Sequence, residues 1–344
     1  MQSDSSPVDK NAQQRHEERV AQAKSIIREV QTLYDAGAPL FTKDAIRKLG
    51  DELSIFQQGA SSGHQITLRG INGVDYSTFV DCPPVEYEPG KRYHIGGSTW
   101  RINYNSIQWL TVHRDLDFFI PETAYLPMGI CDCVTEIGDA ILEDGSPVPS
   151  TEEVLDVFRD RERQWKTSQH HEQLQAALSA VKTPLVLDKV IAVALGPLVV
   201  GSQIGDKSMV QHALISAIYS SLHQQGILLA SSKRYVQDPA YTPLDKSVLS
   251  SVDLTVVDDP QAFLLLDDSS ILVAIAPDIP VKQIVADICR PGIIIWDTDW
   301  DSDDPITDPP SPRVVKMIKE EYYELEFPDH EYFRDLVMYV KKPA

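Results

Sequence analysis

The order of apolar and polar positions separates the chain into two regions of different character. From Asp188 onward, short apolar runs alternate with helical stretches, beginning with the run VIAVAL and a helix over 207–225. Further strands are predicted at RYVQ, LTVV, ILVAIA and GIIIW, with helices near Leu244 to Ser251 and Val281 to Cys289. Runs that are apolar on both faces, in regular alternation with helices, are typical of a mostly parallel sheet covered by helices. The carboxyl-terminal half is therefore predicted to be a Rossmann-like α/β domain.

The amino-terminal region has a less regular pattern. Residues 12–35 carry apolar side chains at helical spacing, and a second helix follows Thr42, whose hydroxyl can cap it. The alternating segments HQITLRGI, STWRINY and SIQWLTVHR predict strands, and residues 151–181 predict another helix. We therefore expect a disordered start over 1–11, an α+β region over 12–180 and a Rossmann-like domain over 185–341.

Composition narrows the classes of partner. The chain has 31 Lys and Arg against 51 Asp and Glu, a formal net charge of −20. Because polyanions bind proteins through Lys and Arg, this charge disfavours broad DNA or RNA coating. The basic clusters, Lys10 to Arg28 and Arg159 to Lys166, are more typical of solvated helix faces.

The polar first residues lack the apolar middle of a secretory signal, and no apolar run approaches the ~20 residues of a membrane span. This predicts a cytoplasmic protein without a membrane segment. The four cysteines include the pair Cys131 and Cys133 but no second half with zinc-ligand spacing, so no metal site is predicted.

The turn after the first strand of the Rossmann-like pattern is the first candidate for a binding site. In parallel α/β sheets the ligand lies outside the carboxyl ends of the strands, at the topological switch point. Here that turn runs from Gly196 to Gly201 and is followed by Ser202. It lacks the Lys of a P-loop, and Pro197 and Leu198 stand where the dinucleotide fingerprint has its second glycine. Neither phosphate-binding motif is present.

Ser202 is predicted to begin the helix after this turn. Its hydroxyl could act as a nucleophile activated by the helix amino terminus. The simpler alternative is that Ser202 is the amino-terminal cap of that helix.

Several carboxylates are candidates for contacts with a substrate. Asp238 follows the second strand and Asp278 a later one, and both would face the cleft if those strands are adjacent and parallel. A carboxylate there can bind a ribose hydroxyl, an amino group or a guanidinium, or it can cap the next helix. Asp132 and Glu136 stand four residues apart and would share a helix face that could hold a cationic side chain. The acidic surplus makes such a pair common by chance.

Four segments resemble the fungal branch of the SRR-like domain family, named for reduced sensitivity to red light. They are KVIAVALGPL, RYVQDPAYTPLDKSVL, the long block from DDPQAFLLL to GIIIWD, and TDPPSPRVVKMI. The resemblance covers roughly residues 185–341, and LYDAGAPLFTKDAIRKLGDEL is similar to the amino-terminal region of fungal members. It implies a Rossmann-like fold in a family mostly of unassigned activity.

Some fungal members are arginine-containing cyclodipeptide synthases. The resemblance therefore implies an aminoacyltransferase of secondary metabolism that forms a diketopiperazine from arginyl-tRNA and a second aminoacyl-tRNA, without a cofactor. Ser202 would form the acyl-enzyme, and the backbone from Gly196 to Gly201 would stabilise the oxyanion. The guanidinium or α-amino group would be held by Asp132, Glu136, Asp238 and Asp278. The alternatives are a non-catalytic SRR-type regulatory or binding protein and, less favoured, a nucleotide-dependent enzyme.

Overall fold

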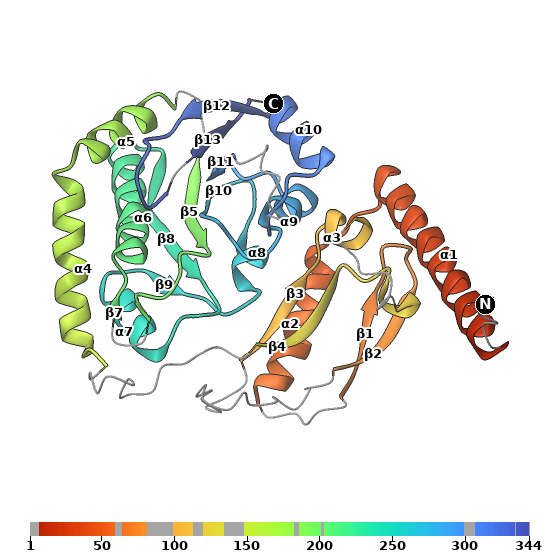
Figure 1. Cartoon of the computed structure of the whole chain (residues 1–344). Helices are drawn as coiled ribbons and strands as arrows, with labels where there is room; N and C mark the ends of the chain where they lie inside the picture. The colour runs from red at the N-terminus through yellow and green to blue at the C-terminus, as the bar shows by residue number, and fades with distance from the viewer. Residues whose placement is uncertain are drawn as a thin grey trace, which may run out of the picture.

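The computed structural model describes residues 7–58, 64–80, 99–112, 120–133, 148–181, 186–200, 203–298, 307–333 and 335–343. Figure 1 shows a central sheet with helices on both of its faces, and the amino-terminal helices and small sheets beside it. The predicted site residues Glu136, Gly201 and Ser202 lie outside the described residues.

The central sheet has seven strands within the described residues, in the order β12-β13-β11-β10-β5-β8-β9. Strands β11, β10, β5, β8 and β9 pair in parallel, whereas β13 runs antiparallel to both of its neighbours. The predicted mostly parallel sheet is therefore confirmed. The strands are β5 (Leu187–Val193), β8 (Leu228–Gln237), β9 (Thr255–Val256), β10 (Ser270–Ala274), β11 (Ile293–Asp297), β12 (Tyr322–Glu326) and β13 (Leu336–Lys341).

The order of connections creates a switch point in the middle of this sheet. The chain passes from β5 to β8 and β9 on one side, and then returns to place β10 on the other side of β5. The two connections therefore leave β5 and β10 in opposite directions, and a crevice is expected where they separate.

Helices cover both faces because successive side chains of the central strands point to opposite sides. Val190 and Ala192 join one buried core, and Ile191 and Val193 join the other. Figure 1 shows α4, α5 and α6 on one side of the sheet and α9 and α10 on the other. The helices are α4 (Thr151–Lys166), α5 (Gln169–Ser179), α6 (Asp206–Gln224), α7 (Pro243–Ser251), α8 (Gln261–Leu265), α9 (Val281–Ile288) and α10 (Pro312–Glu321).

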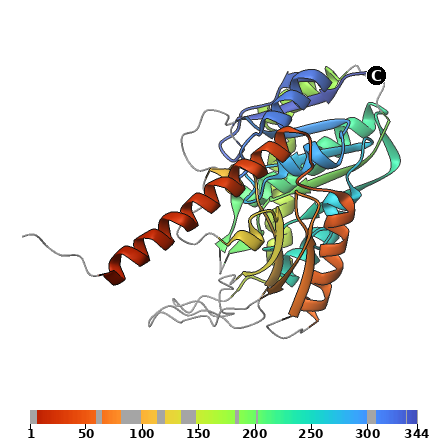
Figure 2. The ribbon, with the colours of Figure 1, turned by 90° about the vertical axis from the view of Figure 1, so that its right-hand side faces the viewer.

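The amino-terminal region combines helices with two antiparallel strand pairs. Thr42 begins α2 as predicted, because its hydroxyl accepts a hydrogen bond from the Ala45 N–H at 3.1 Å. Figure 2 shows α1 projecting well away from the rest of the molecule. The elements are α1 (Pro7–Asp35), α2 (Lys43–Gln57), β1 (His64–Arg69) with β2 (Asp75–Val80), β3 (Thr99–Tyr104) with β4 (Met128–Cys133), α3 (Ile107–Thr111) and η1 (Pro121–Thr123).

Two local predictions were wrong. Within the segment SIQWLTVHR, residues Ile107–Thr111 form the short helix α3 instead of a strand, because the Ser106 hydroxyl accepts a hydrogen bond from the Trp109 N–H at 3.0 Å and the helix buries Ile107 and Leu110. The single helix expected over 151–181 is interrupted between α4 and α5, where Ser168 caps the second helix. The predicted division into regions near residue 180 stays a prediction.

The amino-terminal region packs against the rest of the chain through a shared core and through hydrogen bonds to carboxylates, among them the half-buried Asp259. Asp259 accepts hydrogen bonds from the Ile102 N–H at 3.1 Å and the Tyr104 hydroxyl at 3.2 Å, both in β3. It also accepts one from Gln237 at the end of β8, at 3.3 Å. The Tyr104 ring lies 5.6 Å from that of Phe263 in α8.

None of the helices in the described part of the chain is long and apolar enough to cross a membrane.

Candidate functional site

The turn after β5 lies at the carboxyl edge of the sheet, beside the switch point. Gly196 has a φ of 72°, in the left-handed region that favours glycine, and Ala194 just before it has a φ of 60°. After Gly196 the chain forms a small antiparallel pair, β6 (Val199–Val200) and β7 (Gln203–Ile204). The turn therefore folds back on itself before the next helix begins.

Helix α6 begins one residue before the predicted span 207–225, and therefore after Ser202. Its first residue is Asp206 and its amino-terminal cap position is held by Gly205, with no side-chain cap. The prediction that Ser202 begins or caps this helix is therefore wrong, because β7 lies between Ser202 and the helix. Nucleophilic and oxyanion roles for Ser202 and Gly201 stay predictions, since both residues lie outside the described part of the chain.

Asp238 brings the end of β8 into contact with the turn. One carboxylate oxygen accepts a hydrogen bond from the Gly196 N–H at 2.8 Å, and the other accepts one from the Ala240 N–H at 2.9 Å. Burial raises the pKa of Asp238, the two N–H groups act in the opposite direction, and the charge of Asp278 raises it further. Because β8 and β10 both pair with β5, Asp238 and the exposed Asp278 lie on either side of this turn.

Buried side chains from α6 and α7 hold the backbone of the turn. The Ser208 hydroxyl donates to the Gly196 carbonyl at 2.8 Å, and the Leu198 N–H donates to Asp245 at 2.9 Å. Asp245 is fully buried, and its second oxygen accepts from the Thr242 N–H and hydroxyl, both at 2.7 Å. The turn is thus fixed in position from two helices.

A buried histidine completes this support. His212 in α6 contacts the Tyr241 hydroxyl through Nε2 at 2.7 Å and the Ser208 carbonyl through Nδ1 at 2.7 Å. Burial lowers the pKa of His212 to about 4, so the ring is neutral at neutral pH. Sequence reasoning did not identify these supporting residues. The Thr242 to Asp245 capping box was a signal that could have placed one of them.

A second buried cluster lies at the end of β11. The Lys282 ammonium at the start of α9 is 2.6 Å from the Asp297 carboxylate and 3.6 Å from that of Asp308. Burial raises the pKa of Asp308 to about 7, although the positive charge of Lys282 lowers this pKa. Lys282 is only 2% exposed, so its ammonium is shielded from solvent and interacts with these two carboxylates.

The predicted pair Asp132 and Glu136 does not form a helical trap. Asp132 lies in strand β4, opposite Trp100 of β3, and so belongs to a different sheet from the edge that carries Asp238. A helix face shared with Glu136 is therefore excluded. Glu136 itself lies outside the described residues. Among the residues that are described, no group of three His, Cys, Asp or Glu side chains could hold a metal ion.

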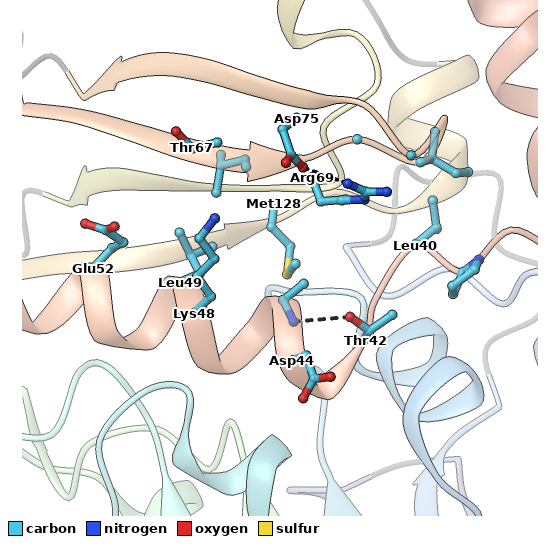
Figure 3. A pocket seen from close by; sticks show the side chains of 16 residues that line it. Leu40, Thr42, Asp44, Lys48, Leu49, Glu52, Thr67, Arg69, Asp75 and Met128 are labelled. Carbon is cyan, nitrogen blue, oxygen red and sulfur yellow. Dashed lines mark hydrogen bonds and ion pairs between the residues drawn. The ribbon is translucent and has the colours of Figure 1, made fainter.

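A separate cavity of about 500 Å³ lies in the amino-terminal region, between α2 and the strand β1. Figure 3 shows side chains from both elements facing this space. Its lining includes the buried side chains of Leu49, Leu68 and Met128 and the charged side chains of Lys48 and Arg69. Sequence patterning did not predict this cavity.

Comparison with solved structures finds likenesses with low identity. The MycE methyltransferase of the mycinamycin biosynthetic pathway, in complex with Mg, SAH and mycinamycin VI, has 11% identity and a TM-score of 0.31. That likeness covers 93% of this chain and 96% of the other. Phosphoethanolamine N-methyltransferase 1 of Haemonchus contortus has 10% identity and a TM-score of 0.28, and the likeness covers 57% of this chain and 50% of the other. No curated protein matches the sequence.

These findings correct the predicted function. The solved structures are methyltransferases, not tRNA-dependent aminoacyltransferases, so the prediction of an arginine-containing cyclodipeptide synthase is wrong. TM-scores this low assign no activity in its place. None of the comparisons bears on the predicted aminoacyl-tRNA partners.

The family comparison agrees with the order of blocks along the sequence. Residues 171–340 match the family model described as the SRR1 domain. The matched segment contains the seven-stranded sheet, except for the last residue of β13, and the turn beside Asp238. The family model therefore supports an SRR-like domain in the carboxyl-terminal part of this chain.

Proposed function

We propose that the carboxyl-terminal domain binds a nucleoside-type ligand without phosphate groups at the carboxyl edge of β5 and β8. The observation that carries the proposal is the position of Asp238, whose carboxylate follows the second strand and holds the Gly196 N–H at 2.8 Å. An acidic side chain near the turn of the first strand is where Rossmann-like proteins bind ribose hydroxyls.

Asp238 keeps acceptor capacity for such a ligand. An ionised carboxylate offers about four lone-pair sites, and each oxygen of Asp238 accepts one backbone N–H. The remaining sites suit two neighbouring hydroxyls. Asp238 is partly exposed, so a ligand can reach these sites from the open side.

The charges at this edge disfavour phosphates. Asp238 and Asp278 lie on either side of the turn, and the buried ammonium of Lys282 is already paired with Asp297. A diphosphate here would meet the carboxylates of Asp238 and Asp278. A neutral or cationic nucleoside avoids that repulsion.

The proposal is compatible with the binding-protein alternative for an SRR-type domain and assigns no reaction. Titration calorimetry on the full chain tests it with adenosine, S-adenosylhomocysteine and S-adenosylmethionine, against AMP, ATP and NAD. We expect the first group to bind and the phosphorylated compounds to bind at least about tenfold more weakly.

Two substitutions test whether the nucleoside binds at Asp238. Asp238→Asn should weaken binding of the nucleosides about tenfold or more, because hydrogen bonds to a charged acceptor contribute about 1.5–3 kcal/mol. The matched control is Asp268→Asn, since Asp268 precedes β10 at the opposite edge of the same sheet. Equal affinities of the two variants, or preferred binding of ATP, would contradict the proposal.

A further inference from the structure

The amino-terminal cavity has the walls of a small-molecule pocket and plays no part in the proposed nucleoside site. Its volume of about 500 Å³ falls within the 300–1,000 Å³ typical of ligand pockets. Leu49 of α2, Leu68 of β1 and Met128 of β4 line the cavity. Figure 3 shows the side chains of Leu49 and Met128 facing this space. These three side chains are buried and form an apolar floor.

The mouth of the cavity is polar, and most of its charges already have partners. Arg69 forms an ion pair with Asp75 at 3.1 Å, and Asp44 forms one with Arg47 at 2.7 Å. These pairs neutralise two carboxylates at the mouth. A third carboxylate, that of Glu52, lies 3.4 Å from the ring of His64.

Lys48 differs from these residues. Its side chain extends from α2 toward the cavity in Figure 3 and is exposed. No described residue lies within ion-pair or hydrogen-bond distance of its ammonium group. The amino terminus of α2, with Thr42 and Ala45 in the lining, adds a positive potential at the same end of the cavity.

We propose that this cavity binds a small amphipathic monoanion, namely an aliphatic carboxylate of medium chain length. The alkyl body would replace water over Leu49, Leu68 and Met128, which is favourable by about 25 cal/mol per Å² of apolar surface buried. The carboxylate would pair with the Lys48 ammonium at the mouth. Apolar burial supplies most of the affinity, and the charge pair selects the anion.

Decanoate and decanol are the probes that test this proposal, because they share an alkyl body and differ in the head group. Titration calorimetry on the full chain, below the micelle concentration, should show that decanoate binds about tenfold more tightly than decanol. Lys48→Gln should remove this difference by weakening decanoate binding only. The matched control is Lys316→Gln, which removes the same charge from an exposed position of α10 outside the cavity lining, and it should keep the preference for decanoate.

A second variant locates the alkyl body. Ala45→Trp fills the cavity from α2 and should abolish binding of both probes, with circular dichroism confirming that the helix content is kept. Three results would overturn the proposal: no binding of decanoate, equal binding of decanoate and decanol to the unaltered chain, or an equal loss in the Lys48 and Lys316 variants. None of these results depends on the nucleoside site.

Discussion

Replacing Lys282 by Met tests how the buried charge cluster at the end of β11 contributes to stability. Met keeps much of the apolar stem but removes the ammonium that lies 2.6 Å from Asp297 and donates to the Asp308 carbonyl at 3.2 Å. Removing one partner of a buried ion pair costs about 3–5 kcal/mol, because the remaining charge stays away from water. Asp297 is 21% exposed and can be partly hydrated, so we expect a loss near the lower limit, about 3 kcal/mol at pH 7.

Urea unfolding followed by tryptophan fluorescence measures this loss, with Trp296 adjacent to the cluster in β11. The loss should be smaller at pH 5, because Asp308, whose pKa is raised to about 7, then carries a proton and leaves less uncompensated charge. Adding Asp308→Asn to Lys282→Met should recover part of the stability at pH 7. Lys316→Met, at an exposed position of α10, is the control. A loss below about 1 kcal/mol, or an equal loss at both pH values, would refute this reasoning.

Two further substitutions test buried polar groups elsewhere. His212 has a folded-state pKa of about 4, below its unfolded value, so the fold loses stability as pH falls from about 6.5 to 4, and His212→Gln should flatten the stability profile in that window. An unchanged pH profile in thermal unfolding would count against a neutral buried ring. Asp259→Ala leaves the Ile102 N–H and the Tyr104 hydroxyl without their acceptor and should cost about 2–3 kcal/mol in urea unfolding, whereas Asp259→Asn should cost less. Equal losses for both Asp259 variants would show that these hydrogen bonds are not the cause.

The carboxyl-terminal sheet could be predicted from sequence because its strands are apolar on both faces and alternate with helices. The position of Asp238 at the same sheet edge as the Gly196 turn followed from the same pattern, since parallel neighbours end at one edge, but its hydrogen bond to Gly196 did not. The helix at Ile107–Thr111 could not be predicted in this way. Five residues give too short a pattern to separate a helical period from a strand period, and the Ser106 cap and tertiary burial decide the outcome.

Contacts between segments far apart in the sequence also could not be predicted from local patterns. Gln283 accepts a hydrogen bond from the Ile107 N–H at 3.0 Å, and Asp259 accepts one from Ile102, although each pair is separated by more than 150 residues. The amino-terminal cavity depends on the angle at which α2 crosses β1, which no local pattern records. Ser202 was placed in the wrong element because the β6 and β7 pair is too short to leave a periodic signal.

The core shared by the two regions limits how the SRR1 segment can be used as a separate unit. Ile191, Leu272 and Trp296 of the sheet are buried in the same cluster as Phe41 and Ile102 of the amino-terminal region. A gene fragment encoding only residues 171–340 would expose that face and should give aggregated product on expression. Fusions and truncations should therefore keep both regions together. Natural variation at Tyr104 and Phe263, whose rings meet across this core, should be correlated among relatives.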